Sequence, residues 1–148
     1  MEEYGQIKTI VNGLKKKFHT SDPFEIADSI GVLYQFGNCT HAGCYMYLKK
    51  HRYIFLSNSL NDCEKQIVMA HELGHALLDT KENCYFIRNK TLLLNSRIEK
   101  RANTFAALLL IDDFLIDEYK YFTKEQFCNL TGLPMELIEL RLKNHVYK

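Results

Sequence analysis

Two histidines within the segment His71-Glu72-Leu73-Gly74-His75 constrain the fold of this chain more than any other feature. On an α-helix, side chains four positions apart lie on one face at about 6 Å, close enough for both imidazoles to bind one tetrahedral Zn²⁺. Glu72 is poorly aimed to bind the same ion, but it can accept a proton from the water that a catalytic metal activates. This HExxH motif therefore predicts a helix with metal ligands at His71 and His75 and a general base at Glu72.

The residues around the motif are uncharged, at positions 68–70 before it and 76–77 after it. This pattern is typical of a helix that is buried around its histidines. Two buried histidines without partners would be costly, whereas a metal ion satisfies both. The surroundings therefore favour a metal site over a chance occurrence of the motif.

A catalytic zinc site needs a third protein ligand and one coordination position open to water. The metzincin pattern would place a third histidine at position 81, where this chain has Lys81. The third ligand must then come from a second helix, and Glu99 follows His75 at a distance that allows a loop and a returning helix. Asn103 lies one turn beyond Glu99, where its oxygen can accept a hydrogen bond from a ligating imidazole.

Two alternatives to Glu99 as a ligand remain open from the sequence. Glu99 stands among Arg97, Lys100 and Arg101, so it can also be read as an exposed carboxylate. Asp79 continues the face of the two histidines by one more turn. Three ligands on one rigid helix would lie almost in a line, which is poor geometry for a tetrahedron.

Apolar periodicity and turn residues predict helices, then a short antiparallel sheet, then more helices, which is an α+β order. We expect helices at 4–18, 23–30, 62–79, 95–110, 113–119, 124–131 and 134–144, and strands at 32–36, 44–49, 53–57 and 84–87. A chain of 148 residues fits one domain, 1–148, in which 111–148 forms a helical C-terminal subregion.

The composition is that of a globular protein, with 47% hydrophobic and 25% charged residues. A net charge of +1 gives no general attraction to nucleic acid or anionic lipid. No leader is recognisable at the start, and the longest apolar run, 105–111, is too short to span a bilayer, so we expect a soluble protein. The five cysteines are irregularly spaced, which favours the cytoplasm; Cys39 and Cys44 lack the second pair that a structural zinc site needs.

The C-terminal segment 127–141 has the outline of a helix-turn-helix. Its second helix shows Glu136 and Glu139 where a recognition helix usually carries Arg, Lys, Asn or Gln. Packing or substrate docking is therefore favoured over direct nucleic-acid binding.

Two features near the motif remain undecided from the sequence. The strand at 44–49 can pair with an extended substrate or simply pack in its sheet. A side chain that donates to the oxyanion cannot be chosen among Tyr45, Tyr47, Tyr53, Tyr85 and His41.

The motif His-Glu-Leu-Gly-His-Ala-Leu-Leu, followed by Glu-x-x-Ala-Asn-x-Phe-Ala-Ala-x-Leu-Leu, resembles the ImmA/IrrE metallopeptidases. Segments 22–32 and 127–142 are also similar to the family. The resemblance implies a small zincin-like metallopeptidase domain with zinc ligands at His71, His75 and Glu99 and a catalytic Glu72. This sequence differs from the family pattern at Asp79, where the family often has histidine, and at 111–112, where it often has proline.

The resemblance also implies a substrate class, namely helix-turn-helix transcriptional repressors of phages, integrative elements or stress regulons. The sequence thus predicts a zinc-dependent endopeptidase that acts on a DNA-binding repressor. A zinc-stabilised module that displaces a repressor without cutting it is the main alternative, and a DNA-binding regulator is disfavoured by the charge balance. Mn²⁺ or Fe²⁺ can occupy similar ligands.

Overall fold

The computed structural model describes residues 2–82, 84–85 and 93–145, which form helices and a small sheet. Its helices are α1 (Glu2–Phe18), α2 (Pro23–Ile30), α3 (Asp62–Leu78), α4 (Leu93–Leu110), α5 (Asp113–Glu118), α6 (Lys124–Thr131) and α7 (Met135–Lys143). The predicted α+β class is confirmed, and the helix bounds agree with those expected from the sequence to within a few residues.

The sheet is mixed, which corrects the expectation of a purely antiparallel one. Its strands are β1 (Leu33–Gly37), β2 (Gly43–Leu48), β3 (His51–Ser57) and β4 (Cys84–Tyr85), in the order β1-β3-β2-β4. Strand β2 runs antiparallel to both β3 and β4, whereas β1 pairs parallel with β3. Strands β2 and β3 form a hairpin, so β2 occupies one edge of β3. Strand β1 pairs with the other edge of β3. Positions 86–87 of the fourth expected strand lie outside the described residues.

Local sequence sets where the motif helix begins. The Asn61 side chain accepts a hydrogen bond from the backbone N–H of Glu64 at 2.8 Å. The Glu64 carboxylate accepts one in return from the backbone N–H of Asn61 at 3.0 Å. This reciprocal capping box satisfies two backbone donors that a helix start otherwise leaves unpaired.

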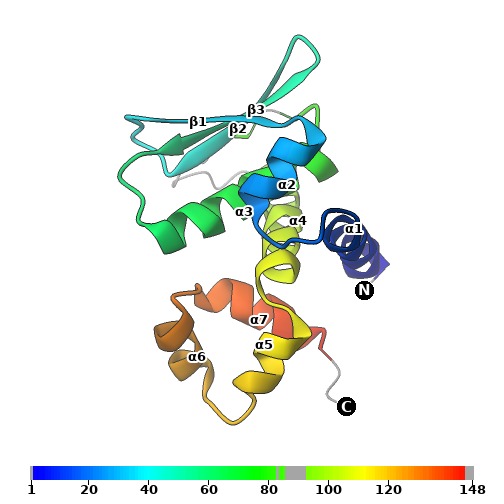
Figure 1. Ribbon diagram of the computed structural model, residues 1–148, viewed down its shortest axis with the longest axis vertical. Coiled ribbons are helices and arrows are strands. Elements are labelled where there is room, and N and C mark those ends of the chain that lie inside the picture. Colours follow the sequence, from blue (N-terminus) through cyan, green and yellow to red (C-terminus); the bar gives the residue numbers. More distant parts are fainter. Residues whose placement is uncertain (1, 83, 86–92, 146–148) are drawn as a thin grey trace.

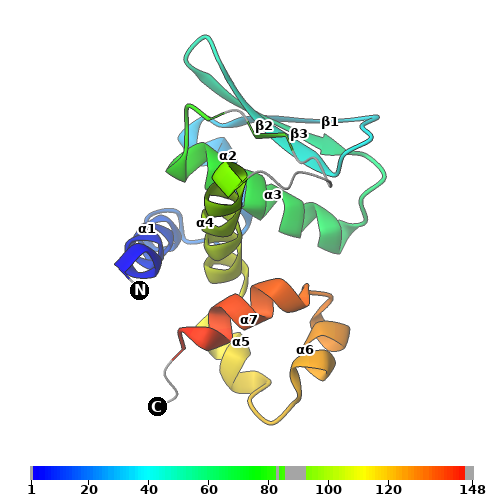
Figure 2. The ribbon, with the colours of Figure 1, turned by 180° about the vertical axis from the view of Figure 1, so that it is seen from behind.

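Helix α3 lies between the sheet and α4 (Figures 1 and 2). Two glycines allow these close approaches. A Cβ atom on Gly43 of β2 would lie 2.7 Å from Val68 Cγ1, and one on Gly74 of α3 would lie 3.0 Å from Ala102 Cα. Large side chains such as Tyr45 and Phe105 are fully buried in the same core. Any larger residue at either glycine would therefore separate α3 from a neighbour.

The C-terminal helices α5, α6 and α7 gather at the end of the molecule away from the sheet (Figure 1), and α7 packs against α4. Arg141 of α7 is only 3% exposed. Its guanidinium donates to the Ile111 carbonyl at 2.6 Å, the Tyr4 hydroxyl at 3.1 Å and Asp113 Oδ1 at 2.9 Å. This buried charge fixes the position of α7 relative to α1 and the end of α4.

Candidate metal centre

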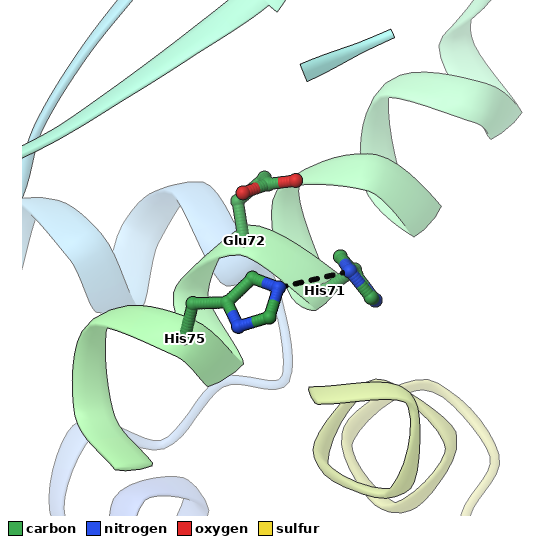
Figure 3. Close-up of side chains that lie close together, drawn as sticks. All are labelled: His71, Glu72 and His75. Carbon is green, nitrogen blue, oxygen red and sulfur yellow. Dashed lines mark hydrogen bonds between the residues drawn. The ribbon is translucent and has the colours of Figure 1, made fainter. Parts of the chain in front are cut away.

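Helix α3 brings His71 and His75 together on one face, as the motif predicted. Their side chains are buried, and their Nε2 atoms lie 3.2 Å apart with the rings almost perpendicular, at 89°. Figure 3 shows the two rings turned toward each other, with Glu72 leaving the helix in a different direction. The two nitrogens can therefore face a common ligand.

Helix α4 supplies a third side chain to the same point. The Glu99 carboxylate approaches His71 Nε2 with Oε2 at 2.9 Å and His75 Nε2 with Oε1 at 3.1 Å. Its side chain remains 33% exposed, so the group also reaches solvent. Helices α3 and α4 thus bring together three potential donor groups from separate parts of the sequence.

The three donors have the chemistry and spacing of a divalent metal site. Tetrahedral zinc with metal–nitrogen and metal–oxygen distances near 2.0–2.1 Å separates neighbouring ligand atoms by about 3.3–3.4 Å. The observed separations of 3.2, 2.9 and 3.1 Å are slightly shorter. Two imidazoles and a carboxylate are also a donor set that suits zinc. The residues therefore fit a metal ion with little rearrangement.

Electrostatics at the site favour a bound cation. Burial would raise the pKa of Glu99, but its hydrogen bonds with His71 and His75 outweigh burial and lower that pKa to about 2. Burial also works against the charged form of both imidazoles. In His71 the hydrogen bond with Glu99 and the negative charges of Glu72 and Glu99 outweigh burial and raise the pKa, whereas burial lowers the pKa of His75. The site thus holds an ionised carboxylate against imidazoles, and a cation can replace the proton between them.

Glu72 is a buried carboxylate next to this site. Burial raises its pKa to about 8, and the charge of His71 only partly offsets that effect. Within the described part of the chain, Glu72 Oε2 and His75 Nδ1 are buried side-chain atoms without a hydrogen-bond partner. Such groups are costly, and exceptions of this kind call for a functional explanation. Donor atoms of His71, Glu72 and His75 lie within 4.8 Å of one another, so Glu72 is close enough to exchange a proton at the site.

A cleft of about 180 Å³ opens beside these residues. Its walls come from three helices, since α3, α4 and α7 all contribute. The polar side chains that line it are His71, Glu72, Glu99, Asn103 and Glu136.

Comparison with known proteins identifies the family. The family described as the IrrE N-terminal-like domain, a peptidase family, matches residues 31–143. The chain belongs to this family. The resemblance to ImmA/IrrE metallopeptidases, with their zincin-like fold, is thereby confirmed.

Two relatives of this IrrE N-terminal-like protein match nearly its whole length. It is 38% identical over 142 residues to Uncharacterized immunity region protein 2 of Bacillus phage phi105, covering 93% of this chain and 90% of the relative. It is 26% identical over 141 residues to Metallopeptidase ImmA of Bacillus subtilis strain 168, covering 92% and 83%. Together with the histidine–glutamate cluster, these matches support a metal-dependent peptidase.

Asn103 makes the contact that its position predicted. Its Oδ1 lies 2.7 Å from His71 Nδ1, so the ring nitrogen donates to the amide oxygen. The Asn103 Nδ2 group donates to Glu136 Oε1 on α7 at 3.0 Å. His71 is thus connected through Asn103, by two hydrogen bonds, to the C-terminal helices.

Asp79, the rival ligand, has a different partner. It lies at the C-terminal end of α3, and its Oδ2 accepts a hydrogen bond from Arg101 Nε at 3.2 Å. Arg101 also pairs with Glu3 of α1. In this family member Asp79 therefore ties α3 to α4 and α1, while Glu99 contacts the imidazoles.

The remaining sequence candidates stand apart from the cleft. Tyr45 is fully buried and donates its hydroxyl to the Thr80 carbonyl at 2.6 Å. Among the described side chains, neither the tyrosines nor His41 line the cleft, and Tyr85 lies outside those side chains. Within the described residues, Cys39 and Cys44 do not belong to any group of three or more potential metal-binding side chains, so they form no clip. In the described chain, α-helices are too short or too polar to cross a membrane.

Sequence reasoning missed the contribution of α7 to the cleft. Pro134, Glu136 and Leu137 line it, whereas in the sequence Glu136 argues only against DNA binding. The position of α7 depends on tertiary packing through Arg141. The only local signal was an acidic residue in the first turn of the last predicted helix.

Proposed function

We propose that this protein is a zinc-dependent endopeptidase with metal ligands His71, His75 and Glu99 and Glu72 as the general base. The observation that carries the proposal is the convergence of three donor groups at 2.9–3.2 Å, with a buried carboxylate beside them in an open cleft. Membership in a peptidase family and similarity to Metallopeptidase ImmA support it.

The proposed reaction is hydrolysis of a peptide bond. A bound zinc ion would act as a Lewis acid toward water and the scissile carbonyl. Glu72 accepts one proton from the attacking water and delivers it to the nitrogen as the carbon–nitrogen bond breaks. Burial gives Glu72 a higher proton affinity than an exposed carboxylate, and a nearby cation would bring its pKa back toward the working range. Asn103 holds the His71 ring through Nδ1 during these steps.

We further propose that the substrate is a helix-turn-helix transcriptional repressor of a phage, an integrative element or a stress regulon. This substrate class follows from the family resemblance, and one relative is named as an immunity region protein of a phage. The thiols of Cys39, Cys44, Cys63 and Cys128 are free, which is consistent with the cytoplasm, where such repressors act. Residues 1–148 would act as one domain, since α7 contributes to the cleft and is fixed by Arg141.

The test compares the wild-type protein with E72Q, which keeps the shape of the side chain but cannot act as the base. E139Q is a matched control, because Glu139 is an exposed residue of α7 that does not line the cleft. Each protein is incubated with a purified candidate repressor and the products are examined by mass spectrometry. We expect fragments with the wild type and E139Q, and none with E72Q at equal metal content.

Two other outcomes would overturn the proposal. If the wild type released the repressor from its DNA without cutting it, the protein would be an interaction module and not a peptidase. Elemental analysis of freshly purified wild type that finds no divalent metal would remove the basis of the reaction, and manganese or iron in place of zinc would correct the metal.

A further inference from the structure

A chain of hydrogen bonds joins the C-terminal helices to the metal centre. Glu136 in the first turn of α7 accepts from Asn103 Nδ2 at 3.0 Å, and Asn103 Oδ1 lies 2.7 Å from His71 Nδ1. His71 Nε2, on the other side of the ring, faces Glu99 at 2.9 Å. Glu136 is the outermost member, because it is exposed in the cleft wall while His71 is buried.

The two ends of an asparagine amide have similar shapes but opposite hydrogen-bonding roles. The oxygen only accepts and the nitrogen only donates. An ionised glutamate also only accepts, so Glu136 can pair with the nitrogen of Asn103 and not with its oxygen. A rotated Asn103 amide would lose this bond and would present N–H groups to His71. The carboxylate therefore selects the amide orientation in which the oxygen faces the ring.

The orientation of Asn103 determines which nitrogen of His71 is available to a metal. When the amide oxygen faces the ring, Nδ1 carries a proton and donates. In the neutral ring the lone pair then lies on Nε2, the nitrogen that faces Glu99 and His75. With the opposite amide orientation, the favoured ring form would carry its proton on Nε2, where it would compete with the metal.

We propose that Glu136 is a positioning residue that holds the Asn103 amide so that His71 presents Nε2 to the metal. This inference rests on the proposed function, in which His71 is a ligand. Because Glu136 is exposed and acts through Asn103, its effect should be smaller than the 10- to 100-fold typical of direct partners of a ligand. We expect removal of its carboxylate to weaken metal affinity about 2- to 10-fold.

The first test measures zinc affinity of the full-length protein by competition with a chromophoric chelator. We expect E136A to bind zinc about 2- to 10-fold more weakly than the wild type. E136Q should stay within about 2-fold, because its amide oxygen can still accept from Asn103 Nδ2. E139A removes a carboxylate from the same helix without that contact and should bind as the wild type does.

Charge and orientation are separated by these variants. If E136Q loses as much affinity as E136A, the negative charge of Glu136 acts on the cation directly and the proposed positioning role is wrong. Equal affinity of E136A and the wild type would overturn it as well. A wild type that binds no zinc would instead refute the proposed function, so the two failures are distinguishable.

A second test changes Asn103 itself. In an N103D background both carboxylate oxygens accept, so there is no orientation left for Glu136 to select. Adding E136A to N103D should leave zinc affinity unchanged, or raise it by relieving repulsion between two carboxylates. A loss by the same factor as in the Asn103 background would overturn the proposal. The unfolding temperature of each metal-free variant confirms that it is folded at the assay temperature.

Discussion

Replacing Gly74 with alanine tests whether the packing of α3 on α4 controls the metal centre. A Cβ at this position would lie 3.0 Å from Ala102 Cα, 3.1 Å from the Ala102 carbonyl oxygen and 3.1 Å from Phe105 Cβ. None of these atoms can move by a change of rotamer. Because carbon atoms prefer separations of about 3.5–4.0 Å, the two helices must move apart by a few tenths of an ångström.

The substitution has two opposing effects on the free energy of unfolding, but it should only weaken metal affinity. Gly to Ala in a helix interior gains up to about 1 kcal/mol of unfolding free energy, whereas overpacking costs about 1–3 kcal/mol. We therefore expect a net loss of up to about 2 kcal/mol. His71 and His75 lie on α3 and Glu99 lies on α4, and metal–ligand distances tolerate only about 0.2 Å. Metal affinity should fall by about tenfold, equivalent to about 1.4 kcal/mol.

The measurements are zinc affinity by chelator competition and the free energy of unfolding of the metal-free protein in urea. G13A is the matched control, because Gly13 lies inside α1 and a Cβ there would meet no atom within 4 Å. It should gain stability by up to about 1 kcal/mol and bind zinc normally. If G74A matched G13A in both measurements, the close approach of α3 and α4 would not be what sets the ligand geometry.

Two further changes address the choice of ligand and the effect of pH. E99A should abolish metal binding while D79A should retain it, since Asp79 pairs with Arg101; elemental analysis giving the reverse would make Asp79 the ligand. Burial would raise the pKa of Asp113, but the hydrogen bond and charge of Arg141 lower it overall. The wild type should therefore have a larger free energy of unfolding than D113N above the unfolded-state pKa of about 4. This difference should disappear as the pH falls through the lower folded-state pKa, and urea unfolding across that range measures it.

The sequence predicted features that depend on local chemistry. The start of the motif helix at position 62 and the spacing of His71 and His75 required only the geometry of one helix. The expected contact of Asn103 with a ligating imidazole required only the face that it shares with Glu99, and the structure has it. Whether these residues hold zinc stays a prediction.

Features that depend on distant contacts were not predictable in the same way. The hairpin of β2 and β3 leaves one edge of β3 for β1, but the parallel direction of β1 depends on how the chain connects β1 to β2, and strand periodicity does not specify this. The charged neighbours of Glu99 in the sequence allow it to be read as an exposed carboxylate, yet it contacts both imidazoles. The contact of Glu136 with Asn103 depends on the docking of α7, which the buried Arg141 stabilises.

Different helices contribute the potential metal ligands and part of the apolar lining of the cleft. The side chains that we propose as metal ligands come from α3 and α4, while Pro134 and Leu137, at the start of α7 and within it, also line the cleft. Substitutions at these two positions can alter the shape of the cleft without touching a donor atom. Under the proposed function, related proteins could thus differ in substrate specificity while keeping the same metal ligands and general base.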